Sequence, residues 1–309
     1  MSEMIYDLII IGAGPSALTA AVYSTRENLN TLLVEKGVVG GLVATIDKIE
    51  NYPGFSEGVE GYVLAEQFKN QAEKFGAKIK YGEVSSIRNE GKNKIVTVDD
   101  EEIKSKALLI ASGSSYRKLN IPGEEEYLSR GIHYCATCDG AFYQDKRIAV
   151  IGGGNSAVQE SLFLMRFVKH IDLISLGDIT ASEVLRKQLD EYEKNGKISL
   201  YTNTETKKII ADSGKVVGIN VIKDGKLKQI LIDGIFVFIG LSPNTQFLKN
   251  SGIIMDKQNF IKTDKDLQTN IPGIFASGDV RNGSIKQIAC ATGEGAIASI
   301  SIREYLSNL

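Results

Sequence analysis

The chain has 309 residues, of which 43% are hydrophobic and 24% are charged, as is ordinary for a globular protein large enough for two domains. The formal net charge of −2 excludes the strongly basic balance of a nucleic-acid-binding protein. No signal-like stretch opens the chain, and the longest apolar runs, residues 8–11 and 235–239, are far too short to cross a bilayer. We therefore expect a cytoplasmic protein with neither a nucleic-acid nor a membrane partner.

The first predicted element is a strand over residues 6–11, which leads through a glycine-rich turn into a helix. Gly12 and Gly14 let the backbone approach a pyrophosphate, and the amides of the helix favour its charge. Ala17 completes the Gly-x-Gly-x-x-Ala pattern, and Glu35 ends the next strand, where its carboxylate can accept hydrogen bonds from a ribose. The segment predicts a dinucleotide site, and tight strand–turn–helix packing is the alternative interpretation.

Two cysteines stand three residues apart at the expected start of a helix, and this spacing can bring their Cα atoms within disulfide range. Helix amides favour thiolates, so Cys135 and Cys138 can cycle by thiol–disulfide exchange. Asp139 follows directly and is placed to relay a proton. Zinc is the rival ligand for such spacing, but the chain offers no second pair of soft ligands, so we expect no metal.

The remaining soft side chains have simpler interpretations. We expect Cys290 to be a small buried residue of the C-terminal helix. His133 is either a group that tunes a thiolate or, the reading we favour, a loop histidine without such a role. His170 lies between a helix and a strand and is expected to be structural.

The pattern of a buried strand, a glycine-containing turn and a helix occurs twice more along the chain. Residues 147–151 form a second buried strand before Gly152-Gly153-Gly154, and adding 140 to 12 and 14 gives 152 and 154. Residues 273–279 form a third strand, followed by a helix from about Gln287 to Tyr305. Continuous apolar strands of this kind indicate parallel sheets covered on both faces.

These elements predict an α/β protein with two Rossmann-like dinucleotide-binding domains, the second inserted in the first, and a small antiparallel meander between residues 78 and 98. We assign residues 1–115 and 245–309 to an FAD-binding domain. Residues 116–244 form the NAD(P)H-like domain that carries the cysteine pair.

Short motifs follow one another along essentially the whole chain: Gly12-Ala13-Gly14-Pro15, Gly40-Gly41, Glu50-Asn51-Tyr52-Pro53-Gly54, Cys135-Ala136-Thr137-Cys138-Asp139-Gly140, Gly152-Gly153-Gly154-Asn155-Ser156-Ala157 and Gly278-Asp279. In this order they resemble the low-molecular-weight bacterial thioredoxin reductase family. The resemblance implies FAD, a homodimer and electron flow from the flavin through the cysteine pair to thioredoxin. It also implies that Cys138 faces the flavin, that Cys135 attacks the substrate disulfide and that Asp139 is the acid.

The resemblance implies a set of flavin contacts in the first domain. Among them, the Asp279 carboxylate suits a ribitol hydroxyl, and the helix that begins beyond it can stabilise negative charge on a reduced flavin. A helix cap is the alternative role for Asp279. The expected contacts are Gly12, Ala13, Gly14, Pro15, Ser16, Glu35, Lys36, Gly40, Gly41, Leu42, Asn51, Val84, Ala111, Ser112, Gly113, Gly278, Asp279, Lys286, Gln287, Ile288 and Ala289.

Two departures from the family pattern bear on the electron donor. Where the family has a His-Arg-Arg stretch and a further arginine that hold the 2′-phosphate of NADPH, residues 174–180 read Ile-Ser-Leu-Gly-Asp-Ile-Thr. Adding 140 to Glu35 gives Ser175, so the acid that favours NADH is missing too. Leu42 also stands where the family has glutamine. The chain therefore resembles the clostridial subgroup that takes electrons from ferredoxin.

Several alternatives remain open at this point. An NADPH-dependent reductase would need phosphate ligands from elsewhere, such as Arg166 or Arg186. Reductases with a deazaflavin donor and small-molecule dithiol oxidases share the general build. From a different class, a flavin-bound redox sensor would use the cysteines to control partner docking, and such a sensor does not need Asp139.

Overall fold

The computed structural model describes residues 5–46 and 48–309, which form two compact units. The first unit runs to Ser115 and resumes at Ser242, and the second unit comprises Tyr116–Leu241. One unit is thus inserted in the other, and the chain returns to the first unit a few residues before the boundary predicted from the sequence.

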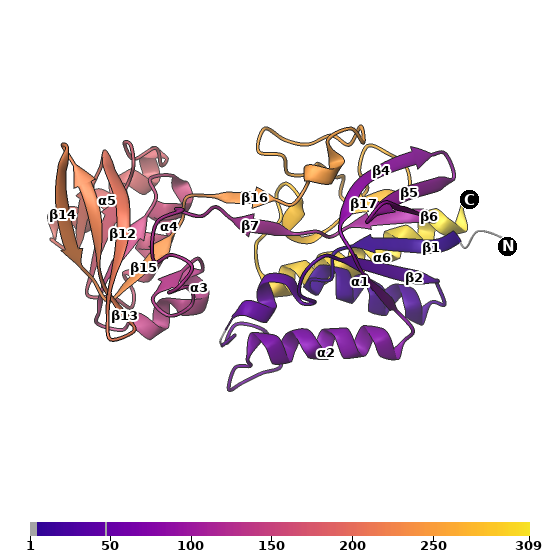
Figure 1. The fold of residues 1–309 in the computed structure, drawn as a ribbon, viewed down its shortest axis with the longest axis horizontal. Helices are drawn as coiled ribbons and strands as arrows, with labels where there is room; N and C mark the ends of the chain where they lie inside the picture. Colours follow the sequence, from indigo (N-terminus) through magenta and orange to yellow (C-terminus); the bar gives the residue numbers. More distant parts are fainter. Residues whose placement is uncertain (1–4, 47) are drawn as a thin grey trace. The chain divides into compact units, whose positions relative to one another are not determined.

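The first unit is built on a mixed seven-stranded sheet (Figure 1). Its strands are β1 (Ile5–Ile11), β2 (Thr31–Glu35), β3 (Lys78–Tyr81), β4 (Val84–Glu90), β5 (Asn93–Val98), β6 (Glu101–Ile110) and β17 (Ile274–Ala276). The strand order is β3-β2-β1-β6-β5-β4, and β17 pairs with β6 beside this path. β1 pairs in parallel with β2 and β6, and its C-terminal half is fully apolar because both faces of the sheet are covered.

The helices of the first unit are α1 (Pro15–Arg26), η1 (Gly41–Thr45), α2 (Gly61–Lys74), η3 (Gln246–Leu248), η4 (Gly278–Val280) and α6 (Ile288–Ser307). The long helices α1, α2 and α6 cover one face of its sheet, and irregular segments with η3 and η4 cover the other. On the helical face, Leu8 and Ile10 form one core cluster with Leu18 of α1 and Ile302 of α6. No helix in the described part of the chain is long and apolar enough to cross a membrane.

The antiparallel part of the first unit differs from the sequence prediction at one strand. β4, β5 and β6 form the predicted meander, but β3 pairs in parallel with β2 at the edge of the sheet. The N-terminal half of β6 pairs with β5 and its C-terminal half with β17. The meander therefore continues directly into the parallel sheet, because one long strand belongs to both.

The second unit repeats the parallel design with five strands. Its strand order is β11-β10-β9-β15-β8, and every pairing is parallel. These strands are β8 (Ile132–His133), β9 (Arg147–Ile151), β10 (His170–Ile174), β11 (Ile198–Tyr201) and β15 (Gly234–Val237). The helices are α3 (Ala136–Asp139), η2 (Gly140–Tyr143), α4 (Asn155–Leu164) and α5 (Glu183–Lys194).

A second antiparallel sheet, missed in the sequence, belongs to this unit. It consists of β12 (Thr204–Asp212), β13 (Lys215–Lys223) and β14 (Lys226–Leu231). The turn between β13 and β14 is Asp224-Gly225, and both residues have positive φ, as a two-residue hairpin of type I′ requires. That Asp-Gly pair between alternating segments was the sequence signal for this hairpin.

The segments that join the units also pair with each other. β7 (Ser114–Tyr116) and β16 (Leu241–Pro243) form a two-stranded sheet. Both lie within a few residues of the domain boundaries predicted from the sequence, between residues 115 and 116 and between residues 244 and 245.

A buried charge fixes two strands of the second unit. The side chain of Asp172 in β10 is fully buried, and Arg147 of β9 donates to both of its carboxylate oxygens, at 2.7 and 2.8 Å. His170 lies 3.5 Å from the same carboxylate. Since a buried carboxylate without its cation keeps its desolvation cost, this pair constrains the register of β9 and β10.

We expect Arg147→Ala to lower the free energy of unfolding by about 2–3 kcal/mol, because it leaves the Asp172 carboxylate buried and uncompensated. Urea denaturation followed by circular dichroism measures the change. Lys187→Ala, which removes an exposed ion pair with Glu183 in α5, is the matched control and should leave the midpoint unchanged. Equal midpoints for the two variants would contradict a structural role for the buried pair.

Candidate functional site

The turn after β1 accepts only glycine at its first position and leaves open space at its third. Gly12 has φ +106°, and a Cβ there would lie 2.5 Å from the carbonyl oxygen of Ala111. At Gly14, a Cβ would meet no heavy atom of the described residues within 4 Å. Pro15 opens α1, whose first amides have no side-chain cap. A bare backbone beside open space at a helix start is the arrangement that a pyrophosphate needs.

Glu35 ends β2 beside this turn, as the sequence predicted. Its Oε2 accepts a hydrogen bond from the amide of Ala13 and its Oε1 one from the amide of Gly37, both at 2.7 Å. A carboxylate oxygen has a second lone pair, so each can still accept a hydroxyl. The two backbone donors thus hold the carboxylate in a fixed orientation at the edge of the turn.

The third segment returns to the same turn through side chains that the sequence interpretation missed. Ser16 and Ser277 share a 2.6 Å hydrogen bond between their hydroxyls. Glu294 of α6 accepts from the amide of Gly278 and from Arg281, at 2.7 and 2.6 Å. A Cβ at Gly295 would overlap the Ser16 carbonyl oxygen, so α6 packs directly on α1 there. The Gly-Glu-Gly stretch inside an apolar helix was the available signal.

Asp279 lies in η4 and carries a carboxyl whose pKa is raised by burial, against a lowering influence of Lys286. Its carboxylate accepts no hydrogen bond from the residues that the structure describes. Lys286 donates instead to the carbonyl oxygen of Asp279 at 2.8 Å and lies 4.7 Å from the ring centroid of Phe260. Burial also lowers the pKa of the Lys286 ammonium. A partly buried carboxylate without a protein donor fits a ligand hydroxyl better than the alternative role of a helix cap.

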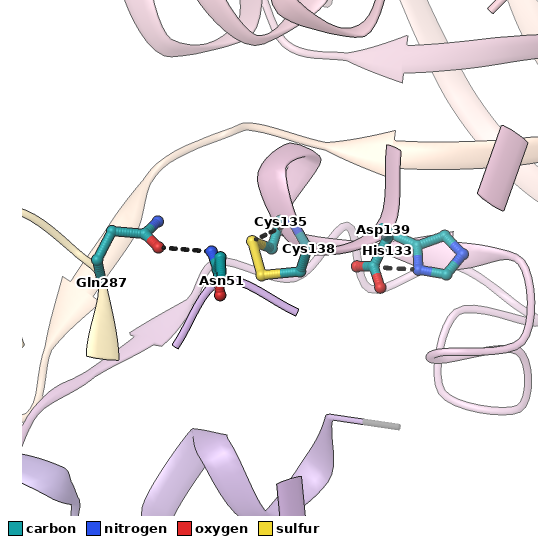
Figure 2. Close-up of a disulfide and its surroundings, with 6 residues drawn as sticks. All are labelled: Asn51, His133, Cys135, Cys138, Asp139 and Gln287. Atoms are coloured by element: carbon teal, nitrogen blue, oxygen red, sulfur yellow. Dashed lines mark hydrogen bonds and ion pairs between the residues drawn. A yellow bond between two sulfur atoms is a disulfide. The ribbon is translucent and has the colours of Figure 1, made fainter. Parts of the chain in front are cut away.

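Several other predicted flavin contacts lie around this turn. The amide of Gly40 donates to the carbonyl oxygen of Ala13 at 2.7 Å, and Gly41 follows at the start of η1. The Asn51 amide donates to Gln287 Oε1 at 3.1 Å, as Figure 2 shows. Gln287 precedes α6, whose first residues are Ile288 and Ala289.

The remaining predicted flavin contacts differ in how closely the structure connects them to the turn. Ala111, Ser112 and Gly113 follow β6, and the Ser112 hydroxyl donates to the carbonyl oxygen of Asn244 at 2.7 Å. Leu42 is 40% exposed. Lys36 forms a surface ion pair with Glu83, and Val84 begins β4, so neither is brought to the turn by a contact in the structure.

The cysteine pair of the second unit is a disulfide. Cys135 caps the N-terminus of α3, and its Cα lies 5.3 Å from that of Cys138 (Figure 2). The Cys138 amide donates to the Cys135 sulfur at 3.2 Å. The local turn thus brings the two sulfurs together as the spacing predicted.

His133 corrects the sequence interpretation, because it is not a loop residue. It lies in β8, only 6% exposed, and its Nδ1 is 3.2 Å from Asp139 Oδ2 (Figure 2). Its Nε2 is 2.7 Å from the hydroxyl of Tyr143 in η2. Parallel pairing with β15 places this strand beside the cysteine turn, which a sequence cannot show for a strand of two residues.

The glycine turn of the second unit is tied to the loop after β10. Gly152 has φ +142°, and the carbonyl oxygen of Gly153 accepts from the amide of Thr180 at 2.7 Å. A Cβ at Gly154 would meet no heavy atom of the described residues within 4 Å. Residues 175–182 contain no lysine or arginine, and Leu176 among them is 76% exposed. The turn is therefore formed, without a cation beside it in this loop.

The remaining soft side chains form no metal centre. The described residues contain no cluster of three or more histidine, cysteine or acidic side chains suited to a metal. Cys290 is partly exposed in α6, which corrects the prediction that it is buried. His170 begins β10 and contacts the carbonyl oxygen of Gly196 and the hydroxyl of Ser199, in keeping with a structural role.

Comparisons of the sequence and of the structure with known proteins find the same kind of relative. Residues 6–295 match the model of the pyridine nucleotide-disulphide oxidoreductase family. The chain is 39% identical over 310 positions to a thioredoxin reductase of Bacillus subtilis, covering 99% of this chain and 96% of the relative. It is 38% identical to a thioredoxin reductase of Treponema pallidum, covering 99% of each. The crystal structure of thioredoxin reductase from Streptococcus pyogenes has a TM-score of 0.92 and 38% identity, with both chains fully covered.

We expect Asp279→Asn to weaken FAD binding by about tenfold, because one charge-assisted hydrogen bond to a ribitol hydroxyl is lost. The FAD-free variant should unfold at no lower temperature than the FAD-free wild type at pH 7. A carboxyl whose pKa is raised in the folded state loses stability as the pH rises through that pKa, and the amide has no charge to bury. The difference in unfolding temperature between the FAD-free variant and the FAD-free wild type should therefore disappear below about pH 4.

Fluorescence titration of FAD at pH 7 and thermal unfolding from pH 3 to pH 8 measure both effects. Asp266→Asn at an exposed position is the control. Unchanged FAD affinity in Asp279→Asn would show that this carboxylate does not hold the cofactor.

Proposed function

Because the chain belongs to the low-molecular-weight bacterial thioredoxin reductase family, whose members are FAD-binding flavoproteins, we propose that it passes electrons from FAD through Cys135 and Cys138 to thioredoxin. The observation that carries this proposal is the disulfide between these cysteines, with Asp139 directly after it. Bound FAD supplies a carrier that accepts electrons singly or in pairs.

The first unit fits FAD. Gly12 and Gly14 leave a bare backbone at the start of α1, and Glu35 is held ready for a ribose. Asp279 offers a partly buried carboxylate without a donor among the described residues, and Gln287 precedes α6 close to Asn51. We propose that these residues hold the pyrophosphate, the ribose, the ribitol and the ring system of the flavin.

In the second unit we assign one role to each polar group of the turn. Cys138 exchanges electrons with the flavin, and Cys135 attacks the thioredoxin disulfide. The Cys138 amide, which donates to the Cys135 sulfur, favours negative charge there when the pair is reduced. Asp139 moves a proton between sulfurs. A redox sensor would not require that carboxylate.

We propose ferredoxin as the electron donor. Sheet register supports this, because Val34 and Ile174 pair with the last residues of β1 and β9, which makes Glu35 and Ser175 structural equivalents. The ribose carboxylate of the first unit is thus a buried serine in the second. Asp178 near it is bonded to Asn203 and adds negative charge where a 2′-phosphate would lie. Such a site disfavours NADPH, whereas a flavin can receive single electrons from an iron–sulfur protein.

We also propose a homodimer formed through the first unit. Large apolar side chains are exposed on its helices: Tyr23 of α1, Tyr62 and Val63 of α2, and Ile297 and Ile300 of α6. Exposed apolar side chains on three helices of one unit are candidates for burial against a partner. Since the family forms dimers, a second copy of this chain is the proposed partner.

Cys135→Ser and Cys138→Ser should each abolish thioredoxin reduction while FAD stays bound, because exchange needs both sulfurs and the flavin contacts lie in the first unit. Steady-state reduction of thioredoxin, with the flavin absorbance as the binding measure, checks both points. Cys290→Ser is the control and should retain activity, since it is not part of the disulfide. More than a few per cent of wild-type activity in either variant would remove the pair from the mechanism.

Reduced ferredoxin should bleach the flavin at least about 100-fold faster than NADPH, because two charge-assisted phosphate contacts of the family are missing. It should also act faster than NADH, because Ser175 stands in place of the carboxylate that binds the ribose. Anaerobic stopped-flow reduction by the three donors at matched potentials measures this. Rapid bleaching at micromolar NADPH would instead support an NADPH enzyme. Arg186→Ala then tests the rival ligand, because Arg186 lies one turn after Ser182 at the start of α5. A raised NADPH requirement in that variant would place the phosphate there.

A further inference from the structure

We propose that His133 is a positioning residue for Asp139, held in place by Tyr143, so that Tyr143, His133 and Asp139 form a linked set beside the Cys135–Cys138 turn. This inference rests on the proposed function, because Asp139 must first act as the proton carrier of the cysteine pair. The set belongs to the second unit alone and uses a buried histidine that the mechanism above leaves without a role.

The contacts of the two ring nitrogens assign one tautomer to His133. Nδ1 lies 3.2 Å from Asp139 Oδ2, and Nε2 lies 2.7 Å from the Tyr143 hydroxyl. A carboxylate only accepts, so Nδ1 carries the hydrogen, and a neutral ring then accepts at Nε2 from the tyrosine. Burial raises the pKa of Tyr143, with a further contribution from the charge of Asp139, so its hydroxyl stays a donor. Each polar atom of the imidazole is thus satisfied in one arrangement.

Packing holds the imidazole in this orientation. The ring of His133 stacks on Phe236 at a centroid distance of 5.1 Å and meets Tyr143 edge-on at 5.2 Å. Tyr143 also packs edge-on against Phe236. A Cβ at Gly234 would overlap the Tyr143 ring, so glycine at the start of β15 makes room for it. Because packing fixes both rings, Nδ1 of His133 faces Asp139 with little further loss of side-chain entropy.

The charged and titratable groups around Asp139 come from three segments. β8 contributes His133, and η2 contributes Tyr143. Asp233, just before β15, adds negative charge near Tyr143, and its carboxylate accepts from the amide of Arg147. His133 Nδ1 is thus the nitrogen that faces the Asp139 carboxylate, and its N–H can donate to it.

The proton transfer that Asp139 carries out involves only the cysteine pair and thioredoxin, and its atoms and electrons balance as follows. The Cys135 thiolate attacks one thioredoxin sulfur, the thioredoxin disulfide breaks, and its other sulfur leaves as a thiolate. The Asp139 carboxylate takes the proton of the Cys138 thiol, and the Cys138 sulfur attacks the Cys135 sulfur. The bond between Cys135 and thioredoxin then breaks, and Asp139 returns its proton to the departing thiolate. The enzyme is oxidised and thioredoxin is reduced by the same electron pair.

Two substitutions at His133 separate positioning from packing. In His133→Asn, the amide nitrogen occupies the place of Nδ1 and can still donate to Asp139. In His133→Gln, the amide reaches the place of Nε2 and can bond only to Tyr143. If His133 acts through Nδ1, His133→Gln should slow thioredoxin reduction by about tenfold or more with little change in KM, and His133→Asn should stay within about threefold of the wild type. Tyr143→Phe removes one oxygen, keeps the packing and should give an intermediate loss.

The measurement is a single turnover of thioredoxin by pre-reduced, FAD-loaded enzyme between pH 5 and pH 9, which does not depend on the donor. The ratio of the His133→Gln rate to the wild-type rate should change with pH across this range, because the proton carrier Asp139 loses its contact with His133 Nδ1. A structural defect would lower the rate equally at every pH. His170→Gln is the matched control, since His170 contacts Gly196 and Ser199 but not Asp139. It should behave as the wild type.

Thermal unfolding and flavin absorbance confirm that each variant is folded. A wild-type profile in His133→Gln and Tyr143→Phe, or an equal loss in His133→Asn and His133→Gln, would overturn the positioning role while the cysteine mechanism stands. Thioredoxin reduction by Cys138→Ser would instead overturn the proposed function itself, so the two failures are distinguishable.

Discussion

The structure depends on one steric constraint that occurs in both units. At the end of the central strand the backbone turns so closely past a neighbouring segment that no Cβ fits. A Cβ at Gly12 would lie 2.5 Å from the carbonyl oxygen of Ala111, and one at Gly152 would overlap that of Phe238. Each close contact places the N-terminus of a helix at the C-terminal edge of a parallel sheet. Folds of this kind bind their ligands at that edge. The rest of each site is assembled around that edge.

The two units then use the same framework for different chemistry. In the first, carboxylates surround the turn: Glu35 is held by two amides, and Asp279 is partly buried without a donor among the described residues. Burying a carboxyl in this way costs stability, so we attribute it to ligand binding rather than to folding. In the second, the equivalent of Glu35 is a buried serine, and the adjoining loop bonds back to Gly153. The polar groups that remain available lie around the disulfide, after β8.

Around the disulfide, short local elements and long-range pairing act together. The turn from Cys135 to Cys138 brings the sulfurs together through its own backbone. Asp139 is then oriented by His133, which comes from a strand of two residues fixed by pairing with β15. The same strand pairing places Phe236 under the imidazole. A proton carrier whose partner is buried and stacked has one orientation, which suits a step between closely spaced sulfurs.

The sequence by itself determined the features that depend on local pattern. The apolar runs, the glycine turns, the acid ending β2 and the cysteine spacing predicted the parallel sheets, the inserted unit and the disulfide, because each is set by neighbours in the chain. Only the tertiary structure decided the features that depend on pairing across the fold. It made β3 a parallel edge strand, added the sheet of β12 to β14, partly exposed Cys290 and moved His133 from an expected loop to a buried strand beside Asp139. No periodicity marks a strand of two residues, and burial of a polar ring becomes visible only when its partners from other segments are in place.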